Sequence, residues 1–278
     1  MKKTILIAVF SLTICMIFGQ SFPRDKPELL LNKEVTPKIY SEESQHSHYR
    51  NFFFEYKNFM RQFLSNPENK PFFAGSESSP RSEYAELVGK KFKVLEVFEI
   101  GDNEFGLKLE NSEIGIIYYK YCPKYYHNFE LEVLDKLDFP DDYFCSEIEL
   151  VKDKFTGDER YYTPLKRGIN FVKEVKKGGV TTYYLSSTVG NPSLTVKGEG
   201  FYILFDDGSK FSRPNARIDV EVYDAENYLY DAFVVLSAKE LKMFSEKLIT
   251  DKRMFLFDSE IDEESALLIR EYVKCLMK

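Results

Sequence analysis

Two segments near the middle of the chain alternate strictly between apolar and polar residues. The apolar members stand at every second position, as Phe105, Leu107 and Leu109 in one segment and Phe129, Leu131 and Val133 in the other. Because successive side chains of a β-strand point to opposite faces, this period of two predicts strands with one buried face. Asn111-Ser112 and Gly101-Asp102-Asn103 supply turn residues beside the first segment. We therefore expect a small β unit over residues 83–146.

The remaining residues, 147–278, begin with a series of strand patterns. Strands are expected over six apolar segments, at residues 148–153, 169–175, 180–187, 201–205, 217–223 and 228–236. Lys177-Gly178-Gly179 and Asp206-Asp207-Gly208 are hairpin signals, since tight turns need the positive φ that glycine tolerates. This part of the chain therefore predicts a second antiparallel sheet.

The end of the chain carries two helix signals that enclose a strand. Ser237, followed three residues later by Glu240, is typical of a capping box and predicts a helix through residue 247. Residues 249–257 return to a strand pattern, and residues 262–277 predict a final helix with acids in its first turn. A sheet followed by packed helices indicates an α+β fold, mainly antiparallel β in two units, with a C-terminal helix–strand–helix.

Residues 1–20 have the pattern of an export signal peptide. Lys2 and Lys3 form a short cationic start, and the apolar run at residues 5–14 is followed by a more polar exit. This run is too short to anchor the chain across a bilayer, and no later stretch approaches the roughly 20 apolar residues that a spanning helix needs. We expect an exported protein, periplasmic or extracellular, with no transmembrane segment in the mature chain.

Cys15 raises the alternative of a lipoprotein, in which this cysteine is acylated and begins the mature chain. Such processing favours a small residue immediately before the cysteine, whereas the chain has Leu12-Thr13-Ile14 there. Cleavage between about Gly19 and Phe22, which leaves an unlipidated product, is therefore the favoured expectation.

The segment between the leader and the first β unit predicts a tether followed by a helix. Residues 21–48 are polar, contain three prolines and show no sustained period, so we expect an extended tether that is dispensable for folding. Residues 49–82 predict an amphipathic helix, with aromatic side chains at steps of three and four over 49–64, and then a linker. The aromatic stripe fits a membrane surface or a partner, but covering a sheet is the usual role of such a helix.

The charge balance excludes nucleic acid as a partner. The chain has 38 Lys and Arg against 45 Asp and Glu, a formal net charge of −7, and its basic residues are interleaved with acids. A surface that binds phosphates needs a basic face, which this arrangement does not supply. The 25 Phe and 19 Tyr favour pleated sheet and large apolar faces.

Three cysteines follow the leader, and an exported chain reaches a compartment in which disulfides form. Cys122 and Cys145 bracket one β element and are the disulfide candidate, closing a loop of about 24 residues for roughly 3 kcal/mol of stabilisation. Cys275 lies on the apolar stripe of the last helix, where a small buried side chain is the commoner role. Pairing of Cys145 with Cys275 stays open, and the odd number leaves one thiol free or intermolecular.

One cluster of tyrosines around Cys122 stands out. Five of them fall close together: Tyr118, Tyr119, Tyr121, Tyr125 and Tyr126. An exposed row of such rings can stack on sugars or anchor a protein partner. The alternative is that the rings fill the space between the two β units. We take these five tyrosines as the candidate binding residues.

No catalytic or ligand-binding motif is found in the chain. The nucleophile elbow, the P-loop, the dinucleotide fingerprint and the zinc motif His-Glu-x-x-His are all absent. Asp141, Asp142, Glu147 and Glu149 could supply the paired carboxylates of a glycosidase, whose spacing is set in three dimensions.

Three weaker candidates have simpler explanations. Cys122 with His127 fits a strand end better than a nucleophile with its base, and His46 with His48 lacks a third metal ligand nearby. The acids over 258–264 fit a helix N-terminus better than a calcium loop. We therefore predict no metal site and no cofactor.

Three segments, at residues 153–159, 200–208 and 272–276, are similar in general pattern to segments of other proteins. They read Asp-Lys-Phe-Thr-Gly-Asp-Glu, Gly-Phe-Tyr-Ile-Leu-Phe-Asp-Asp-Gly and Tyr-Val-Lys-Cys-Leu. In these segments the chain resembles uncharacterised exported proteins of Gram-negative bacteria, over about its last half. The resemblance implies no activity and transfers no functional residue.

Together these observations predict an exported, non-enzymatic binding or interaction protein of the bacterial cell envelope, with a protein or a glycan as its partner. The alternative is a secreted hydrolase that acts on a glycan or a peptide through paired carboxylates. Two acids at glycosidase spacing in a cleft would favour the hydrolase, whereas dispersed acids and exposed tyrosines would favour binding.

Overall fold

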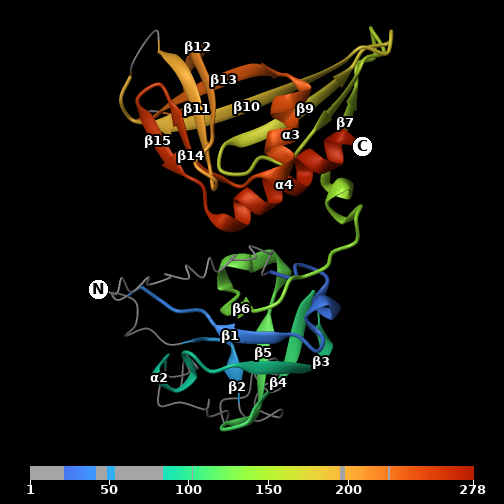
Figure 1. The fold of residues 1–278 in the computed structure, drawn as a ribbon, viewed down its shortest axis with the longest axis vertical. Helices are drawn as coiled ribbons and strands as arrows, with labels where there is room; N and C mark the ends of the chain where they lie inside the picture. The colour runs from blue at the N-terminus through green and yellow to red at the C-terminus, as the bar shows by residue number, and fades with distance from the viewer. Residues whose placement is uncertain (1–21, 42–48, 54–83, 102, 195–197, 225) are drawn as a thin grey trace, which may run out of the picture. The chain divides into compact units, whose positions relative to one another are not determined.

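The computed structural model describes residues 22–41, 49–53, 84–101, 103–194, 198–224 and 226–278 (Figure 1). The chain divides into two compact units, residues 1–138 and 139–278, each of which is described by itself. The predicted signal peptide, most of the predicted amphipathic helix and the linker lie outside the described residues. Of the helices in the described part of the chain, none combines the length and the apolar character that crossing a bilayer requires.

The N-terminal unit contains one antiparallel sheet of six strands in the order β2-β5-β4-β3-β1-β6. Its strands are β1 (Glu34–Pro37), β2 (Phe52–Phe53), β3 (Phe92–Gly101), β4 (Glu104–Asn111), β5 (Gly115–Tyr121) and β6 (Leu131–Val133). In the described residues of this unit, three short helices accompany them, η1 (Pro27–Leu30), α2 (Tyr84–Leu87) and η3 (Pro123–Asn128).

The predicted alternation in β4 places its apolar residues on a buried face. Leu109 is paired with Val94 on β3 and with Ile117 on β5, so that three buried side chains form one row across the sheet. The predicted turn after β4 closes because the Asn111 side chain accepts hydrogen bonds from the backbone N–H groups of Glu113 and Ile114, at 2.9 and 3.0 Å. The alternation of apolar and polar residues therefore predicted the centre of this sheet correctly.

The predicted tether over residues 21–48 is wrong for the part that the structure describes. Strand β1 lies inside the sheet, where Val35 is paired with Phe92 on one side and with Val133 on the other. Leu30 and Val35 are completely buried. The segment has too few apolar residues to show a period and contains three prolines, so its pattern resembles that of a loop.

The start of the predicted amphipathic helix is also wrong. Phe52 and Phe53 form β2, which pairs with Tyr119 and Tyr118 of β5, and both phenylalanines are buried. Adjacent aromatic residues favour a strand locally, and that preference outweighed the three- and four-residue spacing here. The rest of that predicted helix, residues 54–64, lies outside the described residues.

The C-terminal unit contains one antiparallel sheet of nine strands in the order β15-β14-β11-β12-β13-β10-β9-β8-β7. Its strands are β7 (Glu149–Lys152), β8 (Glu159–Tyr162), β9 (Ile169–Val175), β10 (Thr181–Asn191), β11 (Glu199–Phe205), β12 (Lys210–Val222), β13 (Tyr228–Leu236), β14 (Ile249–Met254) and β15 (Phe257–Glu260). The six predicted strands are present, whereas β8 and the first half of β12 were not predicted. The predicted strand over 249–257 is two strands of a hairpin.

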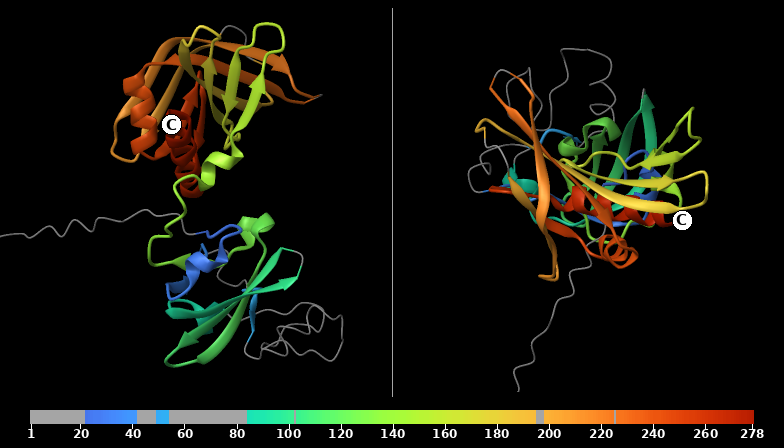
Figure 2. Two further views of the ribbon diagram at one scale, coloured as in Figure 1. Left: turned by 90° about the vertical axis from the view of Figure 1, so that its right-hand side faces the viewer. Right: turned by 90° about the horizontal axis from the view of Figure 1, so that it is seen from above.

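Two helices, α3 (Ala238–Glu246) and α4 (Glu263–Met277), lie on the same face of this sheet (Figures 1 and 2). The predicted capping box is confirmed, because the Ser237 hydroxyl accepts from the Glu240 N–H and the Glu240 carboxylate accepts from the Ser237 N–H. Phe244 of α3 contacts the rings of Phe171 and Phe205, with ring centroids 5.1 and 5.2 Å apart. The core of this unit therefore lies between the sheet and the two helices.

The boundary between the units differs from the predicted one. It follows Asp138, because the next residues pack on the last helix. Phe144, in the short helix η4 (Tyr143–Glu147), packs against Leu268 and Tyr272 of α4. Residues 139–146 therefore belong to the C-terminal unit and not to the small β unit.

The sheet is irregular where β11 meets β12. Glu199 is paired with Arg217 and Phe201 with Arg213, so that β12 has two extra residues over this interval. Gly200 occupies this position with φ of 103°, a conformation that glycine adopts at little cost. Such a bulge bends the bulged strand and increases its twist.

Candidate functional site

The five candidate tyrosines do not form one exposed row. Tyr119 and Tyr121 point into the core of the N-terminal unit, with 0% and 3% exposure, while Tyr125 is 46% exposed. Tyr118, which precedes Tyr119 on β5, points to the opposite face of the strand and is half-buried, and the side chain of Tyr126 lies outside the described residues. The buried rings pack against aromatic neighbours, among them Phe129, which contacts both.

The cysteine pairing corrects the predicted Cys122–Cys145 disulfide. Cys145 is bonded to Cys275, and Cys122, directly after β5, is a free cysteine of the N-terminal unit. Which cysteines form a disulfide depends on which elements the fold brings together. Here η4 packs directly on α4. The bond therefore joins the first helix of the C-terminal unit to the last one.

The carboxylates considered for a hydrolase do not meet in a cleft. The Glu147 carboxylate accepts a hydrogen bond from the Tyr272 hydroxyl at 2.7 Å, which attaches it to α4. Asp141, Asp142 and Glu149 are exposed, on the turn before η4 and on the edge strand β7. The described residues contain no group of three or more His, Cys, Asp or Glu side chains that could hold a metal ion.

Lys252, on β14, is a buried amine with altered acidity. It is 3% exposed, and its Nζ donates hydrogen bonds to the backbone carbonyls of Arg167 and Thr188, at 2.7 and 2.8 Å. Burial lowers the pKa of Lys252 to about 8. A lysine of lowered pKa can be a nucleophile. Here the amine is buried and bound to backbone carbonyls, so we interpret Lys252 as a structural link from β14 to the loop before β9 and to β10.

We expect the free energy of unfolding to rise with pH because of Lys252. Its pKa is lower in the folded chain than its ordinary value of 10.5, so the unfolded chain binds more protons between pH 8 and 10.5 and raising the pH favours folding. Between pH 7 and 9.5, Lys252 should raise the free energy of unfolding by about 2 kcal/mol. Denaturant unfolding of the wild type and of Lys252→Met across this range measures it, and equal pH slopes for the two proteins would contradict it.

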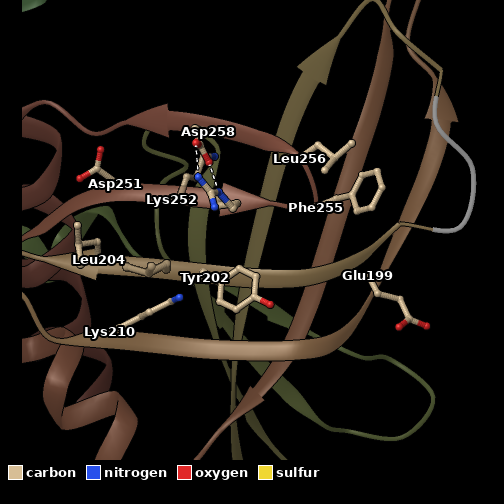
Figure 3. Close-up of a pocket in the computed structure, with 11 residues that line it drawn as sticks. Glu199, Tyr202, Leu204, Lys210, Asp251, Lys252, Phe255, Leu256 and Asp258 are labelled. Atoms are coloured by element: carbon tan, nitrogen blue, oxygen red, sulfur yellow. Dashed lines mark hydrogen bonds and ion pairs between the residues drawn. The ribbon is translucent and has the colours of Figure 1, made fainter.

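A groove of about 770 Å³ lies over strands β11, β12, β14 and β15 of the C-terminal unit (Figure 3). Phe201, Ile203 and Phe205 of β11 face the core beneath α3 and α4. The alternate residues Tyr202 and Leu204 therefore face the opposite side of the sheet, where the groove lies. No helix of the C-terminal unit covers that side in the described part of the chain.

The strand register arranges the groove residues in two transverse rows. Three paired residues form the first row, Asp258 on β15, Arg253 on β14 and Tyr202 on β11. Three more form the second row, Asp251 on β14, Leu204 on β11 and Lys210 on β12. Because neighbouring strands lie about 4.8 Å apart, the side chains of each row are within reach of one another.

The Tyr202 ring lies flat on the floor of the groove, and Figure 3 shows the ring face-on. A Cβ built on Gly200 would fall 3.1 Å from the ring, so the ring rests on the backbone where that strand has no side chain. The Lys210 ammonium stands 4.3 Å from the ring centroid, a cation–π contact. Phe255 similarly lies against Gly198, at the entrance to the β14–β15 turn.

The polar groups of the groove are of two kinds. Arg253 and Asp258 form a two-contact ion pair, with Nη2 and Oδ2 2.6 Å apart, and the guanidinium holds the pKa of the Asp258 carboxyl below its usual range. The side chains of Glu199, Lys210 and Asp251 make no hydrogen bond or ion pair with any described residue, and the Tyr202 hydroxyl makes none either. The groove thus offers both donors and acceptors to a ligand.

A second exposed surface lies on the same side of the sheet, over β10 and β13. Phe233 and Val235 are exposed there, and the Phe233 ring stacks on Tyr184 with centroids 4.8 Å apart. Exposed apolar side chains side by side are typical of protein–protein contact surfaces.

Sequence reasoning missed the groove because its residues come from four strands that are joined only by register. One signal was present in the strand predicted at 201–205: with Phe201, Ile203 and Phe205 facing the core, Tyr202 and Leu204 had to face outward. Comparisons with protein-family models, with curated proteins and with solved structures give no match to this chain.

Proposed function

We propose that this β-rich, α+β protein is an exported, non-enzymatic binding protein of the bacterial cell envelope, and that the groove over β11 and β14 holds its partner. The export-signal pattern of residues 1–20 supports the location. The Cys145–Cys275 disulfide also supports it, since such bonds persist in oxidising compartments such as the periplasm.

One observation carries the proposal of binding. An open groove has a flat tyrosine in its floor and is lined by Glu199, Lys210 and Asp251, whose charged groups make no hydrogen bond or ion pair with any described residue. Binding sites typically combine an apolar surface with a few polar groups that fix the orientation of the ligand. The tyrosine cluster of the N-terminal unit supports binding less well, because its buried rings cannot reach a partner.

The proposal predicts that the mature protein is retained on envelope fragments of the bacterium that produces it. In a sedimentation assay, Tyr202→Ala should reduce the retained fraction about fivefold or more, since a central aromatic residue often dominates a binding surface. The matched control is Tyr223→Ala, a tyrosine of the same unit that is 69% exposed and lies outside the groove.

The thermal midpoints of both variants should match that of the wild type, because neither ring fills the core. Equal retention of Tyr202→Ala and wild type would show that the groove is not the binding site. Retention of neither protein would contradict the envelope binding function itself.

A further inference from the structure

We infer that the groove binds a neutral, hydroxyl-rich oligosaccharide, an assignment that rests on the proposed binding function and names its ligand class. The ring of Tyr202 is the first reason. It lies flat on the strand over Gly200 in the floor of the groove, with the Lys210 ammonium 4.3 Å from the ring centroid (Figure 3). A flat aromatic ring in the floor of a groove suits a chain of linked sugar rings, whose C–H faces are apolar, whereas an anchoring side chain of a protein needs a deep pocket.

The distribution of charge is the second reason. Besides the buried Lys252, the lining carries cations at Lys210 and Arg253 and acids at Glu199, Asp251 and Asp258. A uniformly anionic or cationic ligand that fills the groove would meet charges of its own sign. A neutral ligand avoids this repulsion, so the mixture of charges favours a ligand without net charge.

The free hydrogen-bonding groups are the third reason. Asp251 and Glu199 supply carboxylate acceptors without partners in the described chain, while Lys210 and the Tyr202 hydroxyl supply donors. A sugar hydroxyl both donates and accepts, so one ligand can satisfy both kinds of group. An extended peptide would instead place most of its hydrogen bonds on the backbone of an edge strand, away from these side chains.

The position of these groups gives the expected contacts. Tyr202 occupies the β11 end of the first row, next to Arg253, and Lys210 and Asp251 occupy the ends of the second row on either side of Leu204. A sugar ring stacked on Tyr202 therefore has a donor on one side and an acceptor on the other. The ligand would run across the strands, over a floor four strands and about 14 Å wide.

The test measures binding of three soluble hexamers to the mature protein by titration calorimetry. The neutral probes are the hexamers of N-acetylglucosamine and of α-1,4-linked glucose, and the anionic probe is the hexamer of galacturonic acid. We expect saturable binding of at least one neutral hexamer at millimolar concentration or below, and at least tenfold weaker binding of the anionic one.

Tyr202→Ala should weaken binding of the neutral hexamer at least about tenfold, Tyr202→Phe should weaken it less, and Tyr223→Ala should leave it unchanged. Absence of saturable binding of both neutral hexamers overturns the assignment. Equal binding of the anionic hexamer, or binding that Tyr202→Ala leaves intact, also overturns it.

A second measurement separates this inference from the proposed function. Envelope fragments are digested exhaustively with protease before the sedimentation assay. Retention that survives digestion and depends on Tyr202 supports a glycan ligand. Retention that depends on Tyr202 but is lost on digestion overturns the glycan and identifies a protein partner, while the proposed binding function stands.

Discussion

Replacing Cys275 with serine should lower the free energy of unfolding of the C-terminal unit by about 5 kcal/mol. The Cys145–Cys275 bond joins residues 130 positions apart, so it closes a loop that spans almost the whole unit. In the chain-entropy view, a longer closed loop removes more conformational freedom from the unfolded chain. Because whole domains are stable by only about 5–15 kcal/mol, the variant should be close to unfolded at physiological temperature.

Denaturant unfolding followed by far-ultraviolet circular dichroism measures this effect, and treatment of the wild type with a thiol reductant should reproduce it. Cys122→Ser is the matched control, since Cys122 is a free cysteine of the other unit. It should shift the unfolding midpoint little. A large loss of stability from Cys122→Ser together with none from Cys275→Ser would restore the Cys122–Cys145 pairing that the sequence suggested.

The cysteines show why local sequence patterns could not determine this part of the fold. Cys122 and Cys145 are the closer pair along the chain, and loop length alone made them a reasonable candidate. The true partner depends on η4 packing against α4, where Phe144 contacts Leu268. Such long-range contacts leave no periodic signal in either segment.

The elements that were predicted correctly share one physical property. The strand over 169–175, the capping box at Ser237 and the final helix each carry a complete local signal, a period or a cap, that agrees with the global fold. Strand β8 has only four residues and β1 only four, with Pro37 as its last residue. Strands this short depend on their neighbours for stability, so their sequence alone gives little indication of them.

The candidate site likewise has features that the sequence predicted and features that it did not. That Tyr118 and Tyr119 must point to opposite faces followed from the strand period, and the structure places Tyr119 inside and Tyr118 on the other face. Which face of β5 is buried depended on β2 and on Phe129, which the sequence did not connect to it. The groove required the register of four strands and was invisible in any one of them.

Deletion of residues 22–37 should prevent the N-terminal unit from folding, in contrast to the dispensable tether that the sequence predicted. The deletion removes β1 from between β3 and β6. It also removes Leu30 and Val35, which are completely buried, and Phe22, whose ring contacts Phe129 at 5.1 Å. Burial of three such side chains contributes about 5–9 kcal/mol, as much as the whole stability of a small unit.

Hydrogen exchange of the amides in β3, β4 and β5 measures this result, because those strands should lose protection when the sheet no longer forms. Two adjacent leucines supply a matched pair of point variants. Leu30→Ala removes a completely buried side chain and should cost about 2–5 kcal/mol, whereas Leu31→Ala alters a residue that is 45% exposed and should cost less than about 1 kcal/mol. Removal of residues 1–21 alone should leave protection unchanged. Full protection in the protein that lacks residues 22–37 would mean that β1 is not part of the folded sheet and that the tether interpretation was correct.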